Sequence, residues 1–311
     1  MRLTEEQINT FHQEGYLVVA DLFDDADLQP AIDDLSAEID RQAQELVATG
    51  ELSQTYAHEG FETRLTRIST ETDQVYRSIM AGKLSLPGIF SLLSNPKLLD
   101  AIESLVGPEI IASSVYRLRP KMPGLARGVV PWHQDSAFFE PYCDKSLIVT
   151  VWIPLVDATP ERGCMQVLPR VHSGEVVPHH LPADSHSGLL EIVPDHLPQA
   201  EVVTTPVMKG GALLLTNRTP HRSIENLTDV IRWSMDLRYQ SANLPTNYRT
   251  ETGALFHEPE DDGPIACYPP EADFLIRSQQ HPADVVRDWQ HFHQLRRDHE
   301  VIPVTDRWGL H

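Results

Sequence analysis

The apolar and polar positions near the start of the chain follow a helical spacing. Thr4 opens the run Thr-Glu-Glu-Gln, a capping-box pattern that predicts a short helix through His12. Gly15 is the expected end of this helix, because glycine readily adopts the backbone angles of a helix C-terminus. Tyr16–Val19 then has the composition of a strand.

Two further stretches predict helices. One begins at Asp25 or Asp27, and the other runs from Ser94 to Val106 with Gly107 as a glycine stop. The first has apolar residues at roughly helical spacing, which fits an amphipathic helix against a core. These residues are Leu28, Ile32, Leu35, Ile39 and Leu46.

From Ile110 the pattern changes to short β-rich runs separated by proline, glycine and polar loops. Such punctuation is typical of a β-sandwich or barrel. After Gln240 the chain becomes irregular and rich in proline, and a helix is predicted to return around Ala283–Arg297. The β-rich runs are Ile110–Ala112, Val115–Leu118, Leu147–Ile153, Met165–Leu168, Glu201–Val203, Ala212–Leu215 and Ile231–Leu237.

These patterns predict a mainly β chain with flanking helices (α+β). We expect its core to be a double-stranded β-helix, the jelly-roll or cupin-like form of sandwich, with N-terminal helical support. No segment has the composition of a flexible linker, so one domain spanning residues 1–311 is predicted. It has a helical part (about 1–106), a jelly-roll core (about 107–240) and a C-terminal extension (about 241–311).

Composition and net charge limit the kinds of binding partner and the cellular compartment that we expect for this protein. The formal net charge of -20 would repel nucleic acid and anionic membranes, so neither is an expected partner. The 3 cysteines lack CxxC spacing, which argues against a disulfide framework and for a reducing compartment. The polar start does not resemble a signal peptide, and no apolar run approaches the ~18 residues that span a bilayer. We therefore expect a cytoplasmic protein, and the oligomeric state stays open.

The candidate chemistry begins with His133 and Asp135. On an extended backbone, residues two apart project to the same face, so this pair supplies two thirds of a 2-His-1-carboxylate triad. That ligand set holds non-heme Fe(II) and leaves positions open for substrates. His221 is the best candidate for the third ligand, because it follows the buried-looking run Ala212–Leu215 after a short turn.

Arg232 extends this site toward a cosubstrate. An antiparallel hairpin would bring Arg232 back near His221, with Ser234 on the same strand face. A 2-oxo acid can fill two of the open iron positions, and its distal carboxylate then needs a fixed cation. Arginine offers a planar bidentate fork for that purpose, and a serine beside it can add a hydrogen bond.

With these residues in place, the chain resembles the phytanoyl-CoA dioxygenase family of Fe(II)/2-oxoglutarate oxygenases. The resemblance is specific because it combines several motifs over most of the chain. They are Leu3–Gln7 through Gly15–Val19, His133-Gln134-Asp135, Val151–Asp157, Gly163–Pro169, His221-Arg222-Ser223, Asn226 and Arg232.

The resemblance implies roles for single residues. His133, Asp135 and His221 are expected to bind Fe(II), and Arg232 the distal carboxylate of 2-oxoglutarate. Trp152 matches a tryptophan that borders this cosubstrate. Arg67, in Leu65-Thr66-Arg67-Ile68, falls where relatives carry a basic cosubstrate contact.

The implied reaction consumes 2-oxoglutarate and O2, releases succinate and CO2, and hydroxylates an unactivated C–H bond of a small molecule. Asp135 argues against halogenation, because halogenating relatives carry a small residue there. Two alternatives remain: the same iron site could perform desaturation, epoxidation or oxidative cyclisation, or the chain could be a non-catalytic metal-binding jelly-roll module.

Phe138, Phe139, Tyr142 and Tyr116 are candidates for the substrate pocket, although the first three could equally pack the sandwich. We reject a second metal site among His179, His180 and His186, and we place His291 and His293 on a helix surface. A basic rim for a CoA thioester could come from Arg117, Arg119, Lys121 and Arg127, but the substrate stays open.

Overall fold

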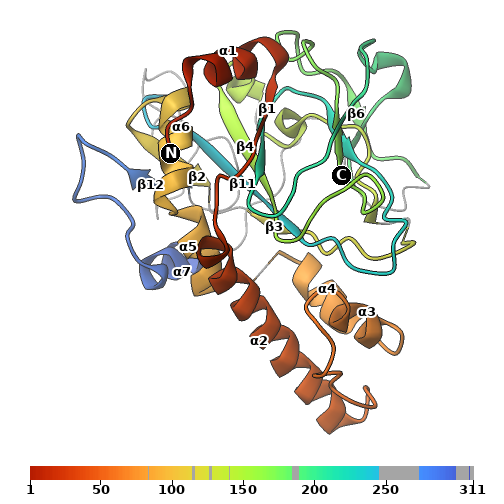
Figure 1. Cartoon of the computed structure of the whole chain (residues 1–311). Coiled ribbons are helices and arrows are strands. Elements are labelled where there is room, and N and C mark those ends of the chain that lie inside the picture. The colour runs from red at the N-terminus through yellow and green to blue at the C-terminus, as the bar shows by residue number, and fades with distance from the viewer. Residues whose placement is uncertain are drawn as a thin grey trace.

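A computed structural model describes residues 1–82, 84–113, 116–125, 128–139, 141–183, 189–244, 273–298 and 308, with the side chains of 142, 297 and 298 left out. Strands form a layered β core, and helices from the first third of the chain cover one side of it (Figure 1). The long helix α2 (Asp25–Thr49) projects beyond the sheets, with α3 (Arg64–Ser69) and α4 (Gln74–Met80) beside it.

The helix starts predicted from capping residues are largely confirmed. In α1 (Glu5–Glu14), Thr4 and Gln7 form both bonds of the capping box, and Gly15 ends the helix at φ 82°. Strand β1 (Tyr16–Val19) follows as expected. Helix α2 is capped by Asp24, with Asp27 returning the second bond, so it begins at the earlier of the two predicted positions.

The helix predicted over Ser94–Val106 is present but begins two residues later, because Ser94 lies at the junction of two helices. Ser94 is the C-cap of α5 (Pro87–Leu93), and the side chain of Asn95 caps α6 (Pro96–Val106) by accepting from the backbone of Lys97 at 2.9 Å. Helices α3, α4 and α5 were not predicted. Each has only 6 or 7 residues, which is too short for a helical period to stand out.

The strand pairings within the described part of the chain are antiparallel, and they confirm the jelly-roll prediction. The main sheet has the order β1-β9-β4-β11-β2-β12, with β3 also paired to β11. A smaller sheet, β10-β5-β8, lies opposite part of it, and β6 pairs with β7. The strands are β2 (Ile110–Ser113), β3 (Arg117–Leu118), β4 (Ile148–Pro154), β5 (Met165–Val167), β6 (His179–His180), β7 (Glu191–Ile192), β8 (Val203–Thr205), β9 (Ala212–Thr216), β10 (His221–Ser223), β11 (Ser234–Ser241) and β12 (Asp273–Arg277).

The hairpin expected between His221 and Arg232 is wrong. Strand β10 pairs with β5, whereas β11 pairs with β4, so the two strands belong to different sheets. The cause is the turn between them: the Asn226 side chain donates to the carbonyls of Lys121 (3.0 Å) and Val230 (2.7 Å). These bonds carry the chain across to the other sheet before β11 begins.

The C-terminal part also differs from its prediction. Strand β12 lies in the stretch predicted to be irregular, where it pairs with β2 at the edge of the main sheet. Helix α7 (Trp289–Asp298) begins six residues later than Ala283. Its Phe292 is buried against Phe90 of α5, with ring centroids 5.2 Å apart.

One apolar core joins the helices to the main sheet. Trp233, fully buried, stacks on Phe61 at 4.9 Å and donates its indole N–H to the Phe61 carbonyl at 3.0 Å. Tyr239 of β11 donates its hydroxyl to the Leu93 carbonyl at 2.6 Å. Among the described helices, none is long and apolar enough to cross a membrane.

The contact between α2 and α5 makes a testable prediction. A Cβ added at Gly88 would lie 2.3 Å from the carbonyl oxygen of Pro30, which is backbone and cannot move aside cheaply. We expect Gly88→Ala to lower the free energy of unfolding by about 1–3 kcal/mol, as overpacking typically does. Gly60→Ala is the matched control, since no atom lies within 4 Å of its added Cβ. Its effect should stay within about 1 kcal/mol, and equal denaturation midpoints for both variants would contradict this account.

Candidate metal centre and cosubstrate cavity

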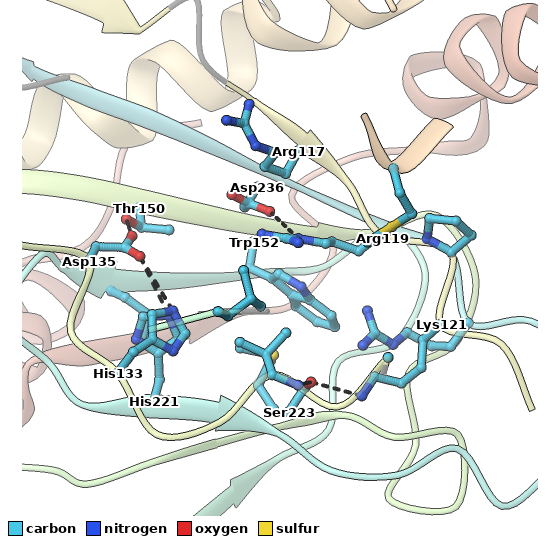
Figure 2. A pocket seen from close by; sticks show the side chains of 18 of the residues that line it. Arg117, Arg119, Lys121, His133, Asp135, Thr150, Trp152, His221, Ser223 and Asp236 are labelled. Atoms are coloured by element: carbon cyan, nitrogen blue, oxygen red, sulfur yellow. Dashed lines mark hydrogen bonds and ion pairs between the residues drawn. The ribbon is translucent and has the colours of Figure 1, made fainter. Parts of the chain in front are cut away.

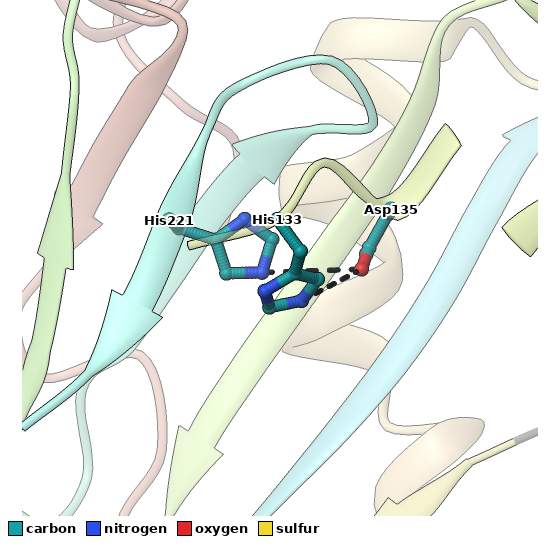
Figure 3. Close-up of side chains that lie close together, drawn as sticks. All are labelled: His133, Asp135 and His221. Atoms are coloured by element: carbon teal, nitrogen blue, oxygen red, sulfur yellow. Dashed lines mark ion pairs between the residues drawn. The ribbon is translucent and has the colours of Figure 1, made fainter. Parts of the chain in front are cut away.

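Three predicted ligands lie together in the structure. The potential ligand atoms of His133, Asp135 and His221 all lie within 4.8 Å of one another, and all three residues are buried (Figure 3). His133 and His221 are joined by an isolated antiparallel bridge, with N–H···O distances of 3.0 and 2.9 Å. This pairing holds the two rings 4.1 Å apart. Asp135 begins the short 3-10 helix η2 (Asp135–Phe138), which turns its carboxylate toward the rings.

The hydrogen bonds of the two imidazoles fix which nitrogen can bind a metal. Nδ1 of His133 lies 2.9 Å from the Pro131 carbonyl oxygen, and Nδ1 of His221 lies 2.9 Å from that of Thr219. A carbonyl only accepts, so each Nδ1 carries the proton and each Nε2 keeps its lone pair. The Nε2 atoms lie 3.6 and 3.9 Å from Oδ1 of Asp135. Two neutral nitrogens and one carboxylate oxygen thus converge, a donor set that fits Fe(II).

Asp135 is held from behind by two other side chains. Its Oδ2 accepts from the Thr150 hydroxyl and lies 3.2 Å from Nη2 of Arg238. Burial alone would raise the pKa of Asp135, but Arg238 and the two histidines outweigh it and keep the pKa well below its usual range. Burial, and then the neighbouring His133, lower the pKa of His221 to about 4. Asp135 and His221 are therefore in the deprotonated forms that metal binding requires.

The three residues form one end of a cavity of about 300 Å³. Figure 2 shows His133, His221 and Asp135 at this end, Lys121 at the other, and Trp152 between them. Other lining residues come from the helices, from both sheets and from connecting loops. They include Tyr76, Met80, Arg117, Arg119, Thr150, Met165, Leu189, Leu215, Ser223, Arg232, Asp236 and Arg238.

Arg232 lies in this cavity, although it is only 2% exposed. Its guanidinium donates to the Ser234 hydroxyl and, at 3.1 Å, to the Gly163 carbonyl, and it sits 5.0 Å from the centre of a Trp152 ring. The structure therefore brings Arg232, Ser234 and Trp152 together. The described wall of the cavity includes Arg232 and Trp152 but not Ser234, which contacts the guanidinium instead.

The structure places Arg67 elsewhere. Its side chain is 60% exposed, and its Nε donates to Glu59 at 3.1 Å on the surface of α3. It is not among the described residues that line the cavity. The exposed ion pair with Glu59 accounts for its position, so its role as a cosubstrate contact stays a prediction from sequence alone.

The aromatic candidates lie near the metal centre or in the core. Phe138 contacts His133 edge to face at 6.1 Å, whereas Phe139 packs with Cys143 and Ile148. The Tyr116 hydroxyl bonds the Leu84 carbonyl and the side chain of Arg296. None of these three residues belongs to the described cavity wall. The fourth candidate is Tyr142, whose side chain lies outside the described residues.

Three of the four cations considered as a CoA rim lie inside the cavity. Arg117, Arg119 and Lys121 line the cavity, and Arg127 lies outside the described residues. Arg119 is 3.5 Å from a carboxylate oxygen of Asp236, and Lys121 is only 4% exposed. These side chains therefore give the interior of the cavity a positive character.

Four residues that line the cavity were not predicted from the sequence: Thr150, Ser223, Asp236 and Arg238. Thr150 and Trp152 alternate along β4, and Asp236 and Arg238 alternate along β11, so each pair projects to one face. Charged residues two apart in an otherwise apolar strand were the available signal for Asp236 and Arg238. Ser223 could have been found in the same way, two residues after His221.

Among the described residues, the one group of three or more metal-type ligands is His133, Asp135 and His221. The rejection of a second metal site in the segment from His172 to His196 stays a prediction. His179 is buried, and its Nε2 accepts from the backbone N–H of Gln134 at 3.1 Å, so it supports the segment that carries the centre. His186 lies outside the described residues. On α7, His291 is exposed as expected, but His293 is half-buried against Trp289.

Comparison with solved structures supports the fold. The chain is similar to a non-heme monooxygenase, ThoJ in its apo form, with a TM-score of 0.55, 17% identity, and coverage of 94% of this chain and 95% of that one. At this level of sequence identity, the similarity supports the fold and nothing further.

Sequence comparison identifies the family. The chain is 24% identical over 247 residues to human (Homo sapiens) peroxisomal phytanoyl-CoA dioxygenase, covering 78% of this chain and 69% of that protein. It is 25% identical over 280 residues to phytanoyl-CoA dioxygenase of Arabidopsis thaliana, covering 78% and 95%. A family model described as phytanoyl-CoA dioxygenase (PhyH) matches residues 11–234. The members are 2-oxoglutarate-dependent non-heme iron oxygenases, so the predicted enzyme class and cofactors are confirmed. The chain belongs to the phytanoyl-CoA dioxygenase (PhyH) family.

Proposed function

We propose that this Fe(II)- and 2-oxoglutarate-dependent dioxygenase hydroxylates an unactivated C–H bond of a small-molecule metabolite and releases succinate and CO2. In this proposal His133, Asp135 and His221 are the iron ligands. The observation that carries it is the convergence of two lone-pair nitrogens and one carboxylate oxygen at the end of a buried cavity. The intact carboxylate of Asp135 favours hydroxylation over halogenation.

Bound iron would supply the chemistry of O2 activation, coupled to oxidative decarboxylation of 2-oxoglutarate. The chain's own residues position the reactants. Arg232 would bind the distal carboxylate through its planar guanidinium, and Trp152 would border the cosubstrate at its side. Arg238 and Thr150 keep the Asp135 carboxylate from rotating away from the histidines. Burial of these groups excludes water from the reacting atoms.

The substrate is proposed to be a small molecule that enters beside α4. Tyr76 and Met80 of this helix line the cavity together with Leu189, a mixed polar and apolar wall. A cavity of about 300 Å³, shared with the cosubstrate, suits a compact metabolite. The relatives' names refer to phytanoyl-CoA, and we do not extend that substrate to this chain.

We propose that residues 1–311 act as a single domain with the three parts expected from sequence. One apolar core that includes Leu35 of α2, Val151 of β4 and Phe292 of α7 supports this proposal. The 3 cysteines without CxxC spacing support a cytoplasmic enzyme. The strongly acidic composition supports an enzyme that binds neither nucleic acid nor membrane.

The ligand assignment predicts the effect of removing one carboxylate. Changing a residue that merely supports a metal ligand costs about 10–100-fold, so we expect Asp135→Ala to lower succinate formation by at least about 100-fold. The protein should also lose bound Fe(II), measured by metal analysis after anaerobic loading. Asp284→Ala is the control, since its carboxylate is 73% exposed. Wild-type levels of iron and succinate in Asp135→Ala would refute the assignment.

The cosubstrate assignment predicts a separate defect. Charged hydrogen bonds contribute about 1.5–3 kcal/mol, so Arg232→Ala should weaken 2-oxoglutarate binding by at least about tenfold and leave the metal affinity unchanged. Titration of the metal-loaded protein measures both. Arg67→Ala tests the remaining sequence prediction: from its exposed position we expect a change of less than about twofold. A large loss in Arg67→Ala, or none in Arg232→Ala, would reverse these roles.

Wild-type protein with O2 and Fe(II) separates the remaining alternatives. Succinate release that requires both distinguishes an oxygenase from a non-catalytic metal-binding module. Mass analysis of the product then distinguishes hydroxylation from desaturation, epoxidation or oxidative cyclisation.

A further inference from the structure

Lys121 and Arg232 lie directly opposite each other in the cavity wall. Their backbones form an isolated antiparallel bridge, with N–H···O distances of 3.0 and 3.2 Å. The same ladder continues through Arg119, which exchanges bonds with Ser234 at 2.8 and 3.3 Å, to Arg117, which pairs with Asp236. Opposed residues of an antiparallel pair project to one face, so the two cations are neighbours.

Neither cation has a carboxylate hydrogen-bonded to it among the described residues. The Lys121 amine donates to the Ser223 hydroxyl at 2.8 Å and the Ile224 carbonyl at 2.6 Å. Arg232 donates to a hydroxyl and a carbonyl, and its buried Nε has no hydrogen-bond partner in the described part of the chain. Like charges directly opposite are destabilising, and buried charges are normally paired. The pair is therefore built for an anion.

We propose that Lys121 is a second cation for the distal carboxylate of 2-oxoglutarate and binds it together with Arg232. This inference rests on the proposed function, which assigns only Arg232 to that carboxylate. Lys121 lies at the end of the cavity away from the metal-type ligands (Figure 2), where the distal end of a metal-bound 2-oxo acid would lie. An ammonium has three N–H groups, and two of those of Lys121 are already used by Ser223 and Ile224.

A purely structural role would not require a lysine. A neutral donor at position 121 would be enough to hydrogen-bond Ser223 and Ile224 at the end of β10. A lysine there must in addition lose the hydration of its ammonium group. Burial, followed by the repulsion of Arg232 and Arg119, lowers the pKa of Lys121 to about 6; the nearby Cys164 and Glu225 act in the opposite direction but are weaker. At pH 8 the empty site therefore holds mainly the neutral amine. A bound anion would raise this pKa, so binding at pH 8 should take up a proton, and affinity should fall as the pH rises above about 6.

The test measures binding, not turnover. The full-length protein is loaded anaerobically with Mn(II) and titrated with 2-oxoglutarate in a calorimeter. The variants are Lys121→Met, which removes the amine, and Lys121→Gln, which keeps a neutral donor for Ser223 and Ile224. Lys209→Met is the charge-matched control, because its amine pairs with Asp25 outside the cavity. Titrations of the wild type at pH 8 in two buffers of different ionisation enthalpy measure proton uptake.

We expect both Lys121 variants to bind 2-oxoglutarate at least about tenfold more weakly, with unchanged Mn(II) affinity and an unaltered control. The wild type should take up a proton at pH 8. If Lys121→Gln bound 2-oxoglutarate with wild-type affinity, residue 121 would be only a neutral structural donor and the inference would be overturned. Binding by the wild type without proton uptake would overturn it as well. This second measurement uses the wild type alone, so it remains valid if a variant fails to fold. A wild type that binds Mn(II) but no 2-oxoglutarate would instead overturn the proposed cosubstrate site.

Discussion

The site depends on one backbone interaction, the isolated bridge between His133 and His221. These residues are far apart in the sequence. Two backbone hydrogen bonds of 3.0 and 2.9 Å join them directly. Because the backbones are paired, the imidazoles lie side by side, with their centroids 4.1 Å apart and their planes tilted by 53°. Each Nδ1 lies near a carbonyl oxygen two residues earlier in its own segment. The short helix that begins at Asp135 then needs only one turn to complete the donor set.

Charge is distributed unevenly in this acidic protein. The chain carries a net charge of -20, yet five cationic side chains line one cavity. The two carboxylates there share Arg238, which lies 3.2 Å from Asp135 and donates to Asp236 at 2.8 Å, and Asp236 also lies 3.5 Å from Arg119. What remains is a positive interior within a negative surface. Such focusing lets a dianion bind where the bulk charge alone would repel it.

The features that were predicted from the sequence depend mostly on residues close together in the chain. The capping box of α1 and the long apolar stripe of α2 are local patterns, and the donor chemistry of His133, Asp135 and His221 was recognisable without a structure. Strand partners were not predictable in the same way. The assignment of β10 and β11 to different sheets depends on Asn226 bonding a carbonyl of Lys121, a residue far from it in the chain.

The ladder opposite Arg232 shows why register, more than composition, determines the site. Arg117, Arg119 and Lys121 alternate along the sequence, so they share one face of their segment. From sequence this run was a possible exposed rim. Pairing with Asp236, Ser234 and Arg232 turns the face inward, and a slip of one residue would turn all of it away from the cavity. The same pairing gives Arg119 a carboxylate neighbour in Asp236 but sets Lys121 opposite Arg232, and a bound anion would balance that end of the ladder.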